Sequence, residues 1–163
     1  MMRTSDLQIR RKPRQSRAKM TQMALKDSFV RLLQQQSADQ ISIRAITDLA
    51  GVGLGTFYEY FSNKNDLIAL TIHLHVKHNA QIMQAHAQQC ISSSAIHQLA
   101  HYLAQIVDFQ ISQVKAQQFL WAQTFLLERQ ISTMHSYRKS YAMMVDMWCQ
   151  ILQNFLNQIT ELH

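Results

Sequence analysis

Glycine is confined to one short segment of this chain. The three glycines among its 163 residues are Gly51, Gly53 and Gly55, which lie within five consecutive positions. Glycine allows the backbone to adopt a positive φ and to approach other groups closely. Residues 42–50 and 54–61 flank the segment, and their apolar spacing is that of two short helices. The pattern predicts one specially shaped tight turn in a chain that otherwise forms long helices.

The first half of the chain predicts a helix-turn-helix followed by a connector helix. Apolar residues recur at helical spacing over about residues 16–35, after Pro13, and Ser42 is a good N-cap for residues 42–50. In that second helix Ile43, Ile46 and Leu49 are expected to face inward. Phe57 and Phe61 are expected to anchor the third helix in the core. A fourth helix, capped by Ser62 or Asn63 and reaching about residue 89, is apolar on two faces and is expected to connect two bodies.

The second half predicts three further helices. Ser92–Ser94 is expected to cap a helix with an apolar face from Ile96 to Gln110, and others are expected over about 115–130 and from about 136. No glycine or proline marks a boundary between residues 109 and 115. No alternation typical of strands is present. The fold class is therefore all-α: an N-terminal three-helix helix-turn-helix domain joined by a long connector helix to a C-terminal helical bundle.

The positive charge is concentrated at the N-terminus. The formal net charge is +6, and residues 1–19 hold seven of the 16 Lys and Arg residues against one acid, Asp6. A basic arm on a neutral body suggests a polyanionic partner, although a solubilising tail would have the same composition. Next to a helix-turn-helix, Arg14 and Arg17 of this arm are expected to contact the phosphates of DNA.

The segment 42–64 has the side chains that a DNA-reading helix needs. Gly53 and Gly55 let the backbone approach phosphates or base edges, because no Cβ stands in the way. The hydroxyls of Thr56, Tyr58 and Tyr60 can donate to phosphate oxygens. Lys64 stands at the start of the fourth helix, where free N–H groups also favour an anion, and Arg44 can reach a phosphate or a guanine edge.

At this point the segment resembles a known family. Residues 50–61, Ala-Gly-Val-Gly-Leu-Gly-Thr-Phe-Tyr-Glu-Tyr-Phe, followed by Lys64 and Leu67, look like the signature of TetR-type (TetR/AcrR) transcriptional regulators, and the likeness extends over about residues 19–79. It implies a homodimeric repressor, occasionally an activator, which binds a palindromic DNA operator and is released by a small-molecule inducer. The two lone cysteines, Cys90 and Cys149, indicate reduced thiols in a cytoplasmic protein. The resemblance implies phosphate contacts for Ser42, Thr56, Tyr58, Tyr60 and Lys64, and base contacts for Arg44, Leu54 and Gly55.

The sequence departs from the family pattern at three places, of which Thr47, where the family prefers alanine, is the mildest. Gly53 stands where the family usually has serine or threonine as the cap of the recognition helix, so a hydroxyl contact is missing there. The chain also stops one or two helices earlier than the usual family architecture. Either this member is short and dimerises through its seventh helix, or the chain is incomplete. The expected domains are a basic arm (1–18), a DNA-binding domain (19–79, with its motif at 42–61) and a ligand-binding and dimerisation domain (80–163).

The C-terminal half is rich in aromatic residues and methionine. Such side chains form adaptable pockets for apolar or aromatic ligands, although they equally form an ordinary bundle core. The residues expected to line an inducer cavity are Phe119, Trp121, Phe125, Tyr141, Met144 and Trp148.

Other functions find weaker support in the sequence. His97 and His101 have the i, i+4 spacing of a zinc chelate, but they fall opposite the apolar face of their helix, and no metal or cofactor is expected. No catalytic motif is present, so an enzyme is not expected. The alternative from another class is a helical module that binds small molecules or proteins and has no operator. No apolar run approaches the length of a membrane span.

Overall fold

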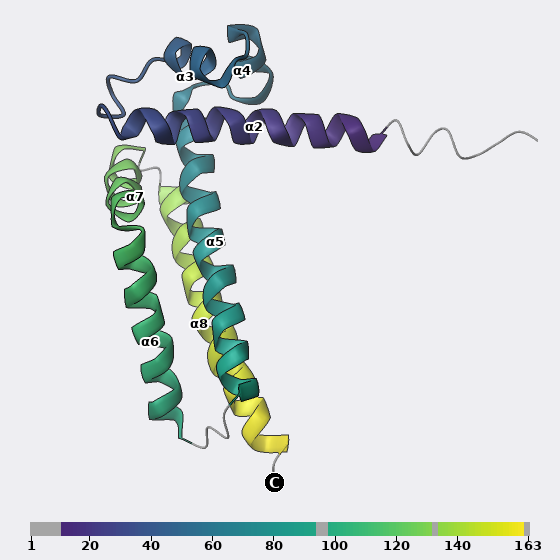
Figure 1. The fold of residues 1–163 in the computed structure, drawn as a ribbon, viewed down its shortest axis with the longest axis vertical. Coiled ribbons are helices and arrows are strands. Elements are labelled where there is room, and N and C mark those ends of the chain that lie inside the picture. Colours follow the sequence, from purple (N-terminus) through teal and green to yellow (C-terminus); the bar gives the residue numbers. More distant parts are fainter. Residues whose placement is uncertain (1–10, 94–97, 132–133, 162–163) are drawn as a thin grey trace, which may run out of the picture. The chain divides into compact units, whose positions relative to one another are not determined.

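The computed structural model describes residues 11–93, 98–131 and 134–161, and these form α-helices with no strand (Figure 1). This confirms the all-α prediction. The helices are α2 (Arg11–Leu33), α3 (Ile43–Ala50), α4 (Leu54–Tyr60), α5 (Lys64–Ser93), α6 (Leu99–Ala116), α7 (Gln118–Gln130) and α8 (Met134–Glu161).

The chain divides into two units, residues 1–70 and residues 71–163. The helix α5 begins in the first unit and continues through the second, as expected for a connector. The division falls between Leu70 and Thr71, whereas the sequence suggested a boundary between residues 79 and 80, further along the same helix.

The core of the first unit consists of side chains from four helices. Leu25 and Phe29 of α2, Ile46 of α3, Phe57 of α4 and Leu67 of α5 are fully buried. The spacing of Leu25 and Phe29 is that of the predicted apolar face of α2. The buried Phe57 and Phe61 confirm the predicted anchor of α4. Burying side chains of this size is what holds two short helices in place, because each large apolar side chain contributes about 1.5–3 kcal/mol.

The helix α2 begins earlier than the sequence suggested. It starts at Arg11 rather than near Ser16, and Pro13 lies inside its first turn. Proline is tolerated there, because the first N–H groups of a helix have no partner within the helix. Residues 11–18 of the predicted basic arm are therefore helical, and residues 1–10 lie outside the described part of the chain.

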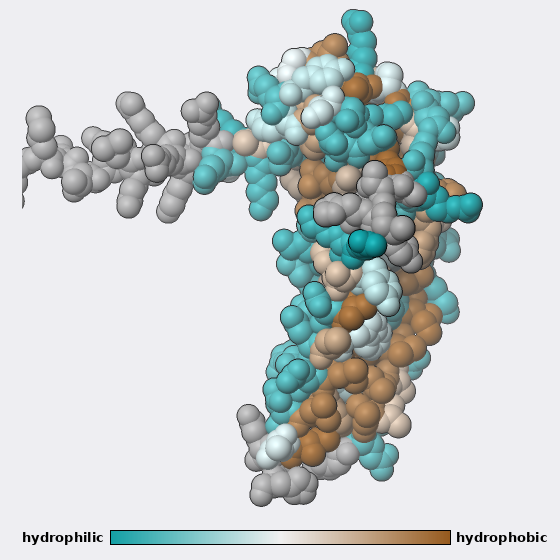
Figure 2. Space-filling model, turned by 180° about the vertical axis from the view of Figure 1, so that it is seen from behind, coloured by the Kyte–Doolittle hydropathy of each residue, from teal (hydrophilic) through white to brown (hydrophobic). Residues whose placement is uncertain are grey.

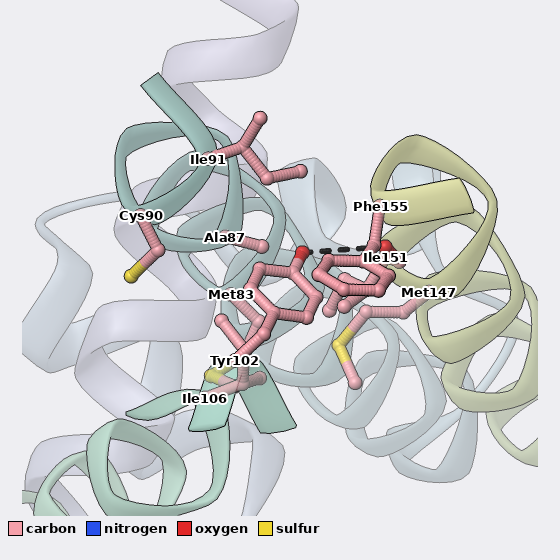
Figure 3. Packing of buried hydrophobic residues seen from close by; sticks show 9 residues of the cluster. All are labelled: Met83, Ala87, Cys90, Ile91, Tyr102, Ile106, Met147, Ile151 and Phe155. Atoms are coloured by element: carbon pink, nitrogen blue, oxygen red, sulfur yellow. Dashed lines mark hydrogen bonds between the residues drawn. The ribbon is translucent and has the colours of Figure 1, made fainter. Parts of the chain in front are cut away.

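The core of the second unit lies between α5, α6 and α8 (Figure 3). Tyr102 of α6 stacks on Phe155 of α8, with ring centroids 4.9 Å apart, and its hydroxyl donates to the carbonyl of Ile151 at 3.2 Å. Two polar pairs also join these helices. The amides of Asn79 and Gln110 bond each other reciprocally at 3.3 and 3.4 Å, and Gln84 of α5 donates to Gln150 of α8.

The predicted serine cap of α6 is wrong. Ser92 and Ser93 belong to α5, and the N-cap of α6 is Gln98, which makes no side-chain cap bond. Ser94 lies outside the described residues. The helix α6 continues to Ala116, through residues 109–115, where the sequence marked no boundary. A single residue, Gln117, then separates α6 from α7.

Tyr102 makes the stability of the second unit depend on pH. Burial, with a further contribution from Cys90, raises the pKa of Tyr102 to about 12. This lies above the value of about 10 in an unfolded chain, so its contribution is complete below about pH 10 and is lost as pH rises towards 12. We expect the free energy of unfolding, measured with urea, to fall over this range.

In the Tyr102→Phe variant, the fall in the free energy of unfolding between pH 10 and 12 that Tyr102 causes should disappear. At neutral pH the variant should lose about 1 kcal/mol of stability, because the carbonyl of Ile151 loses this donor. The same slope from pH 10 to 12 in both proteins would show that Tyr102 does not cause it.

Candidate nucleic-acid interface

The N-terminus of α3 is closed by Ser42, as predicted. Its backbone is extended (φ −84°, ψ 153°) and its Oγ accepts from the backbone N–H of Ala45 at 3.1 Å. The side chain is exposed. Because its oxygen is the acceptor in this bond, its O–H can donate to a further group. Ser42 can thus cap the helix and contact an anion at the same time.

The turn after α3 depends on Gly51. It has φ +69° and ψ 31°, and it alone among the described residues has a positive φ. Its N–H donates to the carbonyl of Asp48 at 3.2 Å, and the N–H of Val52 donates to the carbonyl of Thr47 at 3.0 Å. This pair of bonds is a Schellman motif, which ends a helix with a left-handed residue. The predicted special turn is confirmed.

The other two glycines lie on an open surface. Gly53 is the N-cap of α4 (φ −73°, ψ 155°), as the sequence predicted, and makes no side-chain cap bond. Gly55 lies in the first turn of α4. A Cβ built on either glycine would meet nothing within 4 Å, so neither is required by packing within the chain. The backbone of this turn is accessible to a large partner.

Most predicted DNA-contacting side chains of α3 and α4 are exposed. Leu54 and Tyr58 are 48% and 55% exposed, and the ring of Tyr58 packs edge-on against the buried Phe57. This packing holds an exposed hydroxyl on a fixed ring. Ser42, Arg44, Gly53 and Gly55 are also exposed, and Thr56 and Tyr60 are half-buried.

The two arginines predicted to contact DNA, Arg14 and Arg17, both lie on α2. Arg17 is exposed on α2, where its guanidinium is accessible to solvent. Arg14 belongs to the same helix, and its side chain lies outside the described set.

The orientation of α3 differs from the prediction at one position. Leu49 is 47% exposed instead of facing inward, whereas Thr47 is buried. The Thr47 hydroxyl donates to the carbonyl of Arg44 at 2.9 Å, so the buried polar group is satisfied. The exposed Leu49 adds an apolar side chain to the accessible surface of the helix-turn-helix.

Lys64 has contacts that sequence reasoning missed. Its Nζ donates to the carbonyl of Ala38 at 2.7 Å and to the carbonyl of Ile41 at 3.0 Å, and the side chain is half-buried. The one signal in the sequence is its place in the first turn of a helix, where a cation is unfavourable unless something compensates it.

The cap of α5 is also settled by the structure. Asn63 Oδ1 accepts from the N–H of Asp66 at 3.2 Å, and Asp66 Oδ2 accepts from the N–H of Ser62 at 2.9 Å. The pair is similar to a capping box, except that Asp66 accepts from the N–H of Ser62, one residue before the N-cap Asn63. It fixes the point at which Lys64 begins the helix.

The predicted inducer-binding residues differ in how far they are buried in the second unit. Trp121 is buried and packs on His75, with ring centroids 4.4 Å apart, whereas Phe125 and Tyr141 are 63% and 62% exposed. Phe119 and Met144 are exposed too, and Trp148 packs against the core cluster. The rings of Trp121 and Phe125 are in contact, with centroids 6.3 Å apart. The ligand-binding role of these residues stays a prediction.

Among the described residues no group of three or more His, Cys, Asp or Glu side chains could hold a metal ion. His97 lies outside them, and His101 is exposed beside Gln105. No helix in the described part of the chain has the length and apolar character needed to cross a membrane.

Two short helices joined by a left-handed glycine, the second with an exposed glycine-bordered surface, define a DNA-binding helix-turn-helix domain. Residues 27–70 match the model of a family described as bacterial regulatory proteins, tetR family. The match lies within the segment that the sequence motif indicated and places this domain in that family of DNA-binding transcriptional regulators. Neither curated proteins nor solved structures gave a match.

The three glycines should respond differently to substitution. Gly51→Ala should lower the free energy of unfolding by about 1–2 kcal/mol, because a Cβ is strained at positive φ. Gly53→Ser should raise it by a few tenths of a kcal/mol through a new cap bond. Gly55→Ala should raise it by about 0.5–1 kcal/mol, because alanine favours the helix. Urea unfolding of the three variants tests this, and equal losses at all three positions would contradict it.

Proposed function

We propose that this protein is a sequence-specific transcriptional regulator, a repressor that binds a palindromic operator as a homodimer and leaves it when a small molecule binds. The observation that carries this proposal is the accessible surface of α4, the helix that follows the Gly51 turn. This helix lies within the segment that matches the tetR family. A regulator of this kind is expected in the cytoplasm.

The proposed docking places α4 in the major groove. Its exposed Leu54 and the Cβ-free Gly55 are at the N-terminal end of the helix, the end that recognition helices present to base edges. Thr56, Tyr58 and Tyr60 would donate to phosphate oxygens, which set the position of the helix. Arg44, exposed near the start of α3, would reach a phosphate or a guanine.

The basic N-terminal segment would add affinity without adding specificity. Arg14 and Arg17 lie on α2, within the stretch that holds much of the chain's positive charge. Contacts between these side chains and phosphates release counterions, so binding should weaken steeply with salt.

The homodimer is supported by a second apolar face on α8. One face of α8 packs Met147, Ile151 and Phe155 into the core. An adjacent face leaves further apolar side chains exposed, and Figure 2 shows hydrophobic surface along this part of the second unit. These side chains are Tyr141, Met144, Val145, Leu152 and Leu156. The helix α6 exposes Leu99, Val107, Ile111 and Val114.

A contiguous apolar surface of this kind marks an association site in a soluble protein. Two copies related by a two-fold axis would cover it, and a two-fold axis is what a palindrome requires.

The proposed inducer is a small apolar or aromatic molecule. Aromatic residues and methionines of α7 and α8 support this chemistry, with Trp121 and Phe125 already in contact. Exposed aromatic rings such as those of Phe119 and Phe125 provide the apolar contact area that such a ligand needs.

The DNA contacts can be tested with a duplex selected from random sequences. We expect the selected site to be a palindrome with half-sites about one helical turn apart. Thr56→Ala and Tyr58→Phe should each raise the Kd for it about tenfold, because each removes a hydrogen bond to a phosphate.

Circular dichroism should show that both variants remain folded. Thr160→Ala, which changes an exposed threonine of α8, is the matched control and should bind normally. If no duplex is selected, the operator-binding proposal is wrong. If both variants bind as wild type does, the docking of α4 is wrong.

The dimer can be tested by placing charge on the exposed face of α8. Leu152→Lys combined with Leu156→Lys should convert the dimer to a monomer in sedimentation experiments, because two buried ammonium groups per copy would lack partners. Gln153→Lys, on the polar face of the same helix, should leave the dimer intact. A wild-type monomer, or a dimer that tolerates both lysines, would contradict this interface.

A further inference from the structure

The ammonium group of Lys64 is bound by the loop that precedes α3. It donates to the carbonyls of Ala38 and Ile41, and the side chains of both residues are buried. The same loop is closed by a bond from the N–H of Gln40 to the carbonyl of Ser37 at 3.0 Å. Because Ile41 directly precedes the N-cap Ser42, Lys64 holds the carbonyl next to the point at which α3 begins.

These two bonds compensate for the unfavourable position of Lys64 at the start of a helix. A cation in the first turn of a helix faces the positive end of the helix dipole, which is unfavourable. A lysine side chain also loses rotamer freedom when it is held in one conformation. Two carbonyl oxygens offset both costs. An ammonium group has three N–H donors, so these two bonds leave one for any other partner.

We propose that Lys64 is a positioning residue for DNA binding and not a phosphate contact. Its ammonium fixes the 38–41 loop, and the fixed loop sets the start of α3, where Ser42 and Arg44 face solvent. This inference rests on the proposed operator binding for its consequence in affinity, whereas its structural part concerns the free protein.

The first measurement uses the free protein. Lys64→Met keeps the length and the apolar stem of the side chain and removes the ammonium. Amide hydrogen exchange over residues 40–46 should become faster, because the loop opens more often when its carbonyls lose this donor. Lys64→Arg should restore most of the protection, since a guanidinium has enough N–H donors for both carbonyls. Lys77→Met, which removes an exposed ammonium from the same helix, should change nothing.

The second measurement uses the selected duplex at several salt concentrations. Lys64→Met should raise the Kd about tenfold, the loss expected from about 1.4 kcal/mol. The slope of log K against log salt should stay that of wild type, because no phosphate contact is lost. Lys64→Arg should recover most of the affinity.

Two results would overturn the proposal. Wild-type exchange over residues 40–46 in Lys64→Met would show that the ammonium does not hold the loop. A salt slope reduced by about one would show that Lys64 contacts a phosphate. If the wild-type protein selects no duplex, the operator-binding proposal fails, and the exchange experiment still decides whether Lys64 fixes the loop.

Discussion

The first unit depends on the left-handed turn at Gly51. The helices on either side of it have eight and seven residues, lengths at which an isolated helix is not stable in water. They persist because the turn lets Ile46 and Phe57 reach the same core, where both are fully buried. A residue with a Cβ would be strained at this φ, so one glycine determines whether the surface of α4 exists in a defined place.

The local features of this unit could be predicted from the sequence. Ser42, Gly51 and Gly53 each act on the backbone within a few residues of themselves, so their types and order are sufficient to place both ends of α3 and the start of α4. The apolar face of α2 was likewise readable from its spacing. The same logic failed at Ser92 and Ser93, because serines can also lie inside a helix when the neighbouring turns have no glycine or proline.

The remaining features depend on contacts between distant residues. The apolar spacing predicted Leu49 inside, and Thr47 was marked only as a residue where the family prefers alanine. Thr47 is nevertheless buried, and its hydroxyl is satisfied by the carbonyl of Arg44. Lys64 was predicted to contact a phosphate, whereas the fold brings the carbonyls of Ala38 and Ile41 to it from residues far earlier in the chain. Both cases concern a polar group whose partner is a backbone carbonyl, and a sequence pattern does not show where such carbonyls point.

Under the proposed function, specific DNA binding by the first unit depends on dimerisation through α8 in the second unit. The apolar pattern of α8 alone does not separate the face that holds Met147, Ile151 and Phe155 in the core from the face that exposes Leu152 and Leu156. In a regulator, a seven-residue recognition helix reaches few base pairs, and each well-made base contact contributes only about 1–3 kcal/mol of discrimination. A second copy held by α8 would double the number of such contacts. The sequence specificity of DNA binding by the first unit would then depend on the affinity with which two copies of the second unit dimerise.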